Sequence, residues 1–175
     1  FSIERKCMTT YLVLTIIGED KPGIVESLAT IISDHSGNWL ESSMSQLAGK
    51  FAGILRVSVR EDKCEALINS LNSISKGLKL IIEKVSSENY EEVRQIVEVR
   101  LIGNDRPGII REISKTVTDL AVNFEKLTSE CAPAPMSGDA LFKASASLKI
   151  PQGVSVDLLK HALENLADDL IVDIK

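Results

Sequence analysis

The sequence has few of the residues that hold small folds together through covalent or metal links. Its three cysteines, Cys7, Cys64 and Cys131, are far apart and odd in number, which fits neither a disulfide framework nor a zinc site. Free thiols and the lack of a signal peptide predict a reducing compartment, the cytoplasm. The two histidines, His35 and His161, have no cysteine or carboxylate at metal-ligand spacing, so we expect no metal and no cofactor.

Long apolar runs, aromatic residues and an excess of positive charge are also missing. No run approaches the roughly 20 residues of a membrane span, and aromatic residues make up only 4% of the chain. The net charge of −5 disfavours direct contact with nucleic-acid phosphates. Residues 1–87 contain 10 basic and 10 acidic residues, whereas residues 88–175 contain 10 and 15. The acidic surplus therefore lies in the second half, where we expect a basic partner surface to bind.

The chain does contain an internal repeat. Its 175 residues, 44% of them hydrophobic, fit one ordinary globular domain or two small ones. The sequence GEDKPGIV at residues 18–25 recurs 85 residues later as GNDRPGII at 103–110, with five of eight positions identical. The same offset pairs Asn38 with Asn123. The repeat therefore predicts two similar units rather than one larger domain.

The second copy differs from the first by an insertion. It carries about six extra residues near 131–136. Beyond them the predicted register pairs Phe51 with Phe142, and it pairs the dipeptide at 67–68 with that at 158–159.

Each copy shows the same order of hydrophobic patterns. Short β-branched runs at 12–17 and 96–102 predict strands, and apolar residues three and four apart predict helices. In the first copy the expected helix faces are Ile24, Val25, Leu28, Ile31 and Ile32, then Cys64, Leu67, Ile68, Leu71 and Ile74. The order strand–helix–strand–strand–helix–strand occurs twice, and it is the order of the ferredoxin-like unit.

The predicted fold class is therefore α+β, with two tandem ferredoxin-like (βαββαβ) domains at residues 8–88 and 89–175 and antiparallel sheets. Met8 directly precedes the first apolar run, so we take it as the natural start and leave residues 1–7 out of the fold. Helices cover only one face of each such sheet. We expect the remaining faces or edges to join or stack, and the protein to form a homodimer.

The duplicated turn is the candidate ligand site. The start of a helix presents unpaired N–H groups and a partial positive charge, which suit a carboxylate or phosphate. A glycine there lets a ligand approach the backbone, and an aspartate can pair with an ammonium group, so a small amino acid fits. The prolines are expected in the first helical turn. The residues concerned are Asp20, Pro22, Gly23 and Ile24, and Asp105, Pro107, Gly108 and Ile109.

A second interpretation of this turn stays open. An aspartate before Pro-Gly is common at helix starts, where it caps its own helix. Retention of five residues in two diverged copies favours a ligand, without excluding the cap.

DKPGIV at 20–25 followed by Asn38, and DRPGII at 105–110 followed by Asn123, resemble the opening of an ACT domain. Two such domains over nearly the whole chain resemble the tandem-ACT family of glycine cleavage system transcriptional repressors. The resemblance implies a ferredoxin-like fold and binding of an amino acid, glycine or serine, at an interface between domains. It also implies regulation through a DNA-binding activator protein, without direct contact with DNA. The ligand-binding positions it implies are Asp20, Gly23, Ile24, Asn38, Asp105, Gly108, Ile109 and Asn123.

The copies depart from each other near the turn. Asn104 stands where the first copy has Glu19, and the second copy has the insertion at 131–136, so we expect one site to be degenerate. Trp39 follows Asn38 and is expected in the core rather than in a ligand pocket.

The sequence also bears on other function classes. A protein-interaction module without a ligand remains an alternative, as does a regulatory fragment of an enzyme such as formyltetrahydrofolate deformylase, whose catalytic part would have to follow residue 175. No nucleophile-plus-base pair and no phosphate-binding loop occurs, so we expect no enzyme. The basic face and exposed aromatic residues of RNA-binding ferredoxin-like domains are missing. Asp168 and Asp169 are expected in a solvated turn.

Overall fold

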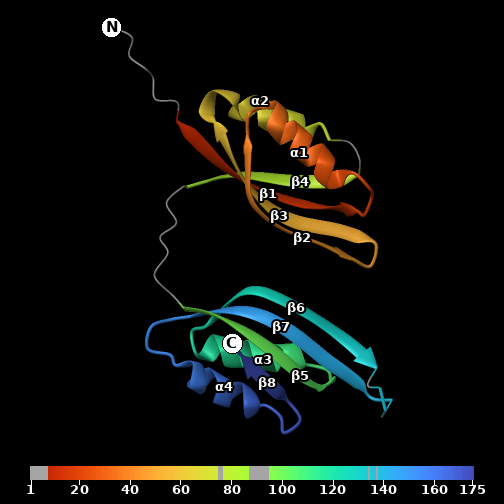
Figure 1. Cartoon of the computed structure of the whole chain (residues 1–175), viewed down its shortest axis with the longest axis vertical. Coiled ribbons are helices and arrows are strands. Elements are labelled where there is room, and N and C mark those ends of the chain that lie inside the picture. Colours follow the sequence, from red (N-terminus) through yellow and green to blue (C-terminus); the bar gives the residue numbers. More distant parts are fainter. Residues whose placement is uncertain (1–7, 75–76, 87–94, 134, 137) are drawn as a thin grey trace. The chain divides into compact units, whose positions relative to one another are not determined.

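The computed structural model describes residues 8–74, 77–86, 95–133, 135–136 and 138–175. The chain divides into two compact units, Phe1–Asn89 and Tyr90–Lys175, which Figure 1 shows in red to green and in green to blue. The predicted domain boundary between residues 88 and 89 and the expectation about residues 1–7 both lie outside the described residues. They stay predictions.

The first unit consists of one four-stranded sheet and two helices. Its elements are β1 (Thr9–Glu19), α1 (Ile24–Asp34), β2 (Asn38–Leu47), β3 (Lys50–Arg60), α2 (Glu61–Asn72) and β4 (Leu78–Val85). The strand order is β2-β3-β1-β4, and every pairing is antiparallel. Both helices lie on one face of the sheet (Figure 1).

The second unit repeats this arrangement. Its elements are β5 (Gln95–Asn104), α3 (Ile109–Asp119), β6 (Asn123–Pro133), β7 (Ala140–Ile150), α4 (Val156–Glu164) and β8 (Ile171–Ile174). The strand order is β6-β7-β5-β8, again antiparallel. The α+β class and the two ferredoxin-like units are confirmed.

The core of the first unit follows from two periodicities. In β1, alternate residues Leu12, Leu14 and Ile16 are buried under the helices, as expected for a strand with one solvated face. In α1, Leu28 and Ile32 continue a stripe of buried residues spaced by four, which begins at Ile24.

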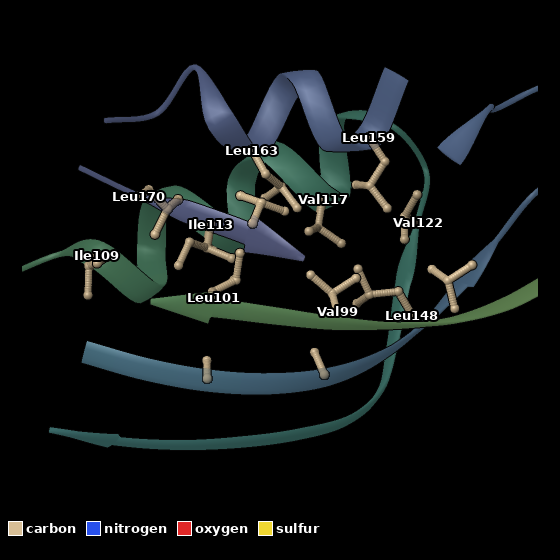
Figure 2. Close-up of a cluster of buried hydrophobic side chains, with 14 of the residues drawn as sticks. Val99, Leu101, Ile109, Ile113, Val117, Val122, Leu148, Leu159, Leu163 and Leu170 are labelled. Atoms are coloured by element: carbon tan, nitrogen blue, oxygen red, sulfur yellow. The ribbon is translucent and has the colours of Figure 1, made fainter. Parts of the chain in front are cut away.

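The core of the second unit repeats these positions 85 residues later. Ile109, Ile113 and Val117 form the buried stripe of α3, and Leu159 and Leu163 of α4 join them above the sheet. Figure 2 shows these five side chains between the two helices and the strands. Residues of α1 and α3 that lie 85 positions apart in the sequence are therefore buried alike.

One residue of the predicted helix faces and one pairing of the predicted register are wrong. Val25, predicted on the buried face, is 47% exposed, because the stripe is spaced by four and Val25 lies one position off it. Leu158 is 49% exposed, whereas Leu159 is buried, so Leu67 corresponds to Leu159 and not to Leu158. The register moves because residues 151–155 separate β7 from α4, whereas α2 follows β3 directly.

A two-residue hairpin joins β2 to β3. Ala48 and Gly49 both have positive φ, 50° and 78°, as in the type I′ turns that match the twist of paired strands. This hairpin ends beside the duplicated turn and helps to position it.

Candidate functional site

In both units the turn places a glycine at the start of a helix in the left-handed conformation. Gly23 precedes α1 with φ 87°, and Gly108 precedes α3 with φ 86°. Pro22 and Pro107 therefore stand before the helices, and the prediction that they lie in the first helical turn is wrong. The reason is that each N-cap glycine has a positive φ, which is not a helical angle. The helix can therefore begin only at the residue after the glycine.

No side chain caps either helix. The N-cap residues are the glycines, which have no side chain. Among the described residues, neither the Asp20 nor the Asp105 carboxylate accepts a hydrogen bond from the first N–H groups of its helix, so the interpretation of these aspartates as helix caps is wrong. Their backbone N–H groups instead donate to the neighbouring hairpin, Asp20 to the Gly49 carbonyl at 3.0 Å and Asp105 to the Ala140 carbonyl at 2.9 Å. The first N–H groups of each helix have no intrahelical partner and form an electropositive end.

An ion pair braces the turn of the second unit. The Arg106 guanidinium donates to both carboxylate oxygens of Glu112, with 2.9 Å between Nη1 and Oε1. This hydrogen bond holds the pKa of Glu112 below its ordinary value and raises that of Arg106. The first unit has Lys21 and Ser27 at these positions, so its turn lacks this pair.

A thiol contacts the aspartate of the second turn. Cys131, on β6, donates a hydrogen bond to the Asp105 carboxylate, and this bond raises the pKa of the thiol. Cys131 pairs with Phe142 across the sheet, as Gln46 pairs with Phe51 in the first unit. The first unit therefore has a glutamine, and no thiol, at the position of Cys131.

Asp169 also holds the second turn. Residues 168–169 form the predicted turn before β8, and the Asp169 carboxylate accepts a hydrogen bond from the Asn104 backbone N–H at 2.7 Å. No local sequence pattern indicated this contact, because 65 residues separate its partners.

Open hollows lie beside both turns, on different sides. In the second unit a hollow of about 420 Å³ is lined by Asp105, Gly108 and Ile109, together with Arg111, Glu130, Cys131 and Phe142. In the first unit a hollow of about 560 Å³ includes Gly23 but faces α2, and it is lined by Glu26, Ser27, Thr30, Ile31, Ser73 and Ile74. The structure therefore brings three predicted site residues together in the second unit and one in the first.

The asparagines lie far from the turn of their own unit. Asn38 begins β2 opposite Ser58, which also pairs with Tyr11 near the start of β1. The turn follows the other end of β1, eight residues or roughly 25 Å away. Asn123 occupies the same place in the second unit, in the row of Ile96. The ligand role of these asparagines stays a prediction.

Sequence reasoning missed the residues that the hairpins bring to the turn. Gly49 in the first unit, and Glu130, Cys131 and Phe142 in the second, contact or line it. The repeat could have indicated these residues. Its register resumes at Phe51 and Phe142, which pair with the ends of β2 and β6 that lie next to the turns.

Trp39 and His35 take part in the packing of the first unit. Trp39 packs partly buried against the first core. The ring of His35 bridges the helices, with Nδ1 2.8 Å from the Ile31 carbonyl and Nε2 3.1 Å from Ser70 Oγ. Within the described parts of the chain, no three His, Cys, Asp or Glu residues gather as a metal site would require. None of the helices among those residues has the length and apolar character needed to cross a membrane.

Several known proteins are similar to this chain. Residues 10–84 match the family model of the ACT domain. The glycine cleavage system transcriptional repressor of Escherichia coli (strain K12) is 21% identical over 162 residues, which cover 91% of this chain and 85% of that protein. The repressor of Shigella flexneri gives the same values.

Two solved structures share the fold over nearly the whole chain. An unknown protein from Galdieria sulphuraria has a TM-score of 0.84 at 23% identity, covering 96% of this chain and 98% of its own. A protein assigned provisionally as a glycine cleavage system transcriptional repressor has a TM-score of 0.70 at 17% identity, covering 96% and 97%. Most of the first unit therefore matches the ACT domain family, which confirms the predicted resemblance, and the second unit repeats the fold of the first.

Proposed function

We propose that the chain is a regulatory protein that binds a small amino acid, glycine or serine, at the turns that open α1 and α3. The observation that carries the proposal is the uncapped, glycine-initiated helix start beside an aspartate, present in both units. An amino acid is a zwitterion. Its carboxylate suits the electropositive helix end, and its ammonium group suits Asp20 or Asp105.

The two turns are not equal in charge. Arg111 lines the hollow of the second unit, whereas the corresponding residue of the first unit, Glu26, lines the hollow there. A guanidinium attracts the carboxylate of the ligand and a glutamate repels it. The second turn is therefore the stronger site in this proposal, and the first is the degenerate one.

The regulatory role rests on similarity to the E. coli repressor. We infer a transcriptional regulator of glycine cleavage, without enzymatic activity, that acts in the cytoplasm through a DNA-binding activator protein. The net charge of −5 supports a protein partner rather than direct contact with DNA.

Calorimetric titration with glycine, serine and the other amino acids tests the ligand. The variants Gly108→Asp and Gly108→Asn form a matched pair, because both side chains tolerate the left-handed backbone and only the first adds a negative charge at the helix end. We expect Gly108→Asp to weaken binding by at least about tenfold and Gly108→Asn to retain it. The same pair at Gly23 shows whether the first turn contributes. If no amino acid binds to the folded protein, the ligand claim is wrong.

A ligand-free interaction module is the second candidate. One observation favours it, namely that the retained glycines and isoleucines of the turn already have tasks in the fold. Asp20→Ala and Asp105→Ala separate the two candidates. Since neither carboxylate caps a helix, we expect each change to alter stability by less than about 0.5 kcal/mol. Loss of amino-acid binding supports the ligand site, whereas unchanged activator binding without any ligand response supports the module.

A further inference from the structure

The face of the first sheet that α1 and α2 leave uncovered has an apolar centre. Ile54 and Ile81 flank Thr15 in one row of paired residues, and Ile17 follows on β1. The side chains of Ile17, Ile54 and Ile81 are 50%, 56% and 59% exposed. We call the following residues the open-face patch: Val13, Thr15, Ile17, Ile54, Arg56, Ile81 and Glu83.

The fold does not need this apolar centre. In the second sheet the row that corresponds to Ile54, Thr15 and Ile81 consists of Ser145, Arg100 and Asp173. The same architecture is therefore built with a polar row at the same place, since one face of an antiparallel sheet can be solvated. An apolar patch rimmed by polar residues is typical of an interaction surface.

The next row of the patch carries two opposite charges. Val13 lies between Arg56 on β3 and Glu83 on β4. Arg56 lies 2.8 Å, Nε to Oε1, from Glu41 and stacks 5.9 Å from the centre of the Tyr11 ring. Glu83 has no ion pair or hydrogen bond with any part of the chain that the structure describes.

We propose that the open-face patch binds the same patch of a second copy of this chain, around a two-fold axis parallel to β1. Such an axis exchanges the β3 and β4 sides of the sheet. Ile54 then faces the partner's Ile81, Thr15 faces its own copy, and Arg56 faces the partner's Glu83. The pattern is self-complementary in both hydrophobicity and charge, as an isologous interface requires.

The dimensions of the face indicate a weak dimer. Stacked sheets lie about 10 Å apart, a gap that an arginine and a glutamate can span together. The axis along β1 overlaps three strands of each sheet, because no strand beyond β4 faces the partner's β2. Three strands and about eight residues give a face of roughly 14 by 26 Å, or about 370 Å² on each partner. The total of about 750 Å² lies below the size of stable specific interfaces, so we expect a dimer that dissociates in the upper micromolar range.

Sedimentation equilibrium between about 1 and 500 μM tests the proposal. We expect the wild type to show reversible dimerisation over this range, and Arg56→Glu and Glu83→Arg to be monomeric, since each change sets like charges opposite each other. In a heterodimer of the two variants, the substituted position 56 of one copy faces the substituted position 83 of the other, which sets a glutamate opposite an arginine. The unchanged Glu83 and Arg56 form the second pair, as in the wild type. The mixture should therefore form heterodimers with at least half of the wild-type dimer fraction.

The control is Asp173→Arg, a charge reversal on the open face of the second sheet, which should leave the dimer unchanged. Circular dichroism confirms that each variant is folded. A wild type that is monomeric throughout overturns the proposal and leaves the patch to another part of the chain or another protein. A dimer that survives both reversals, or a mixture that stays monomeric, overturns it as well.

Discussion

Single residues of the duplicated turn have separate physical tasks. Gly23 supplies a φ of 87° that other L-residues adopt at a cost of about 1–2 kcal/mol. Gly18 supplies space, because a Cβ there would lie 2.8 Å from the Gly77 carbonyl oxygen. Ile24 supplies buried apolar surface. These tasks explain the retention of three of the five turn residues without a ligand, and they leave Pro22 and the Asp20 carboxylate without an assigned task.

The glycines before the two turns differ in what surrounds them, which predicts unequal effects of the same substitution. At Gly18 a Cβ would meet a backbone oxygen, whereas at Gly103 its nearest neighbour would be Leu170 Cδ1 at 3.1 Å. A side-chain methyl can move more easily than a backbone carbonyl group. We expect Gly18→Ala to destabilise by about 1–3 kcal/mol and Gly103→Ala by clearly less, measured by urea unfolding. Equal losses would contradict this explanation.

The Arg106–Glu112 pair predicts an acid-sensitive contribution to stability. The pKa of Glu112 in the folded state lies below its ordinary value of 4.5, so the pair stabilises the fold above that value, and this contribution is lost as the pH falls through the folded pKa. We expect Glu112→Gln to melt slightly below the wild type at pH 7, and the two curves to converge in acid. The difference is small because both groups are exposed. Asp119→Asn, which breaks an exposed pair in the same helix, is the control.

At the scale of elements, local patterns predicted most of the structure and long-range contacts decided the site. The helix stripes and strand alternation could be predicted because they depend on neighbours within one or two turns of chain. The start of α1 could not, because Pro22 and Gly23 are both compatible with a first turn until the backbone angle is known. Asn38 was predicted as a site residue from the resemblance to the ACT domain, and its ligand role stays a prediction. The antiparallel return of α1 places it at the opposite end of β1.

The β2–β3 hairpin predicts a stabilising substitution. Ala48 has φ 50° in a type I′ turn, where asparagine and glycine are preferred over alanine. We expect Ala48→Asn to raise the free energy of unfolding by about 0.5–1 kcal/mol and Ala48→Val to lower it, since a β-branched residue is strained there. Urea unfolding of the three proteins measures both signs. A stabilising valine would show that this turn changes its conformation.

At the scale of the whole molecule, two separate cores follow from the repeat. The buried clusters of the first and second units share no residue. Each unit has about the size at which a single domain is marginally stable. Stability is therefore expected to be set unit by unit.

The single tryptophan allows this to be measured. Trp39 packs against the core of the first unit, so its fluorescence reports on that unit. Leu28→Ala, at a fully buried position, should lower the stability seen by Trp39 fluorescence by about 2–5 kcal/mol. Leu159→Ala, equally buried in the second unit, should shift the circular dichroism transition more than the fluorescence one. Identical shifts by both probes for both variants would show that the units unfold as one.

The sequence by itself determined the number of units, the order of elements, the α+β class and the position of the duplicated turn. These follow from periodicity and from an internal comparison, which need no knowledge of distant contacts. Only the tertiary structure decided what surrounds each turn. Strand pairing brings Cys131 and Glu130 to Asp105 in the second unit, and it places Gln46 at the position of Cys131 in the first. It also decided that the central row of the uncovered face is apolar in the first sheet and polar in the second, because residues from three strands meet in that row only after folding.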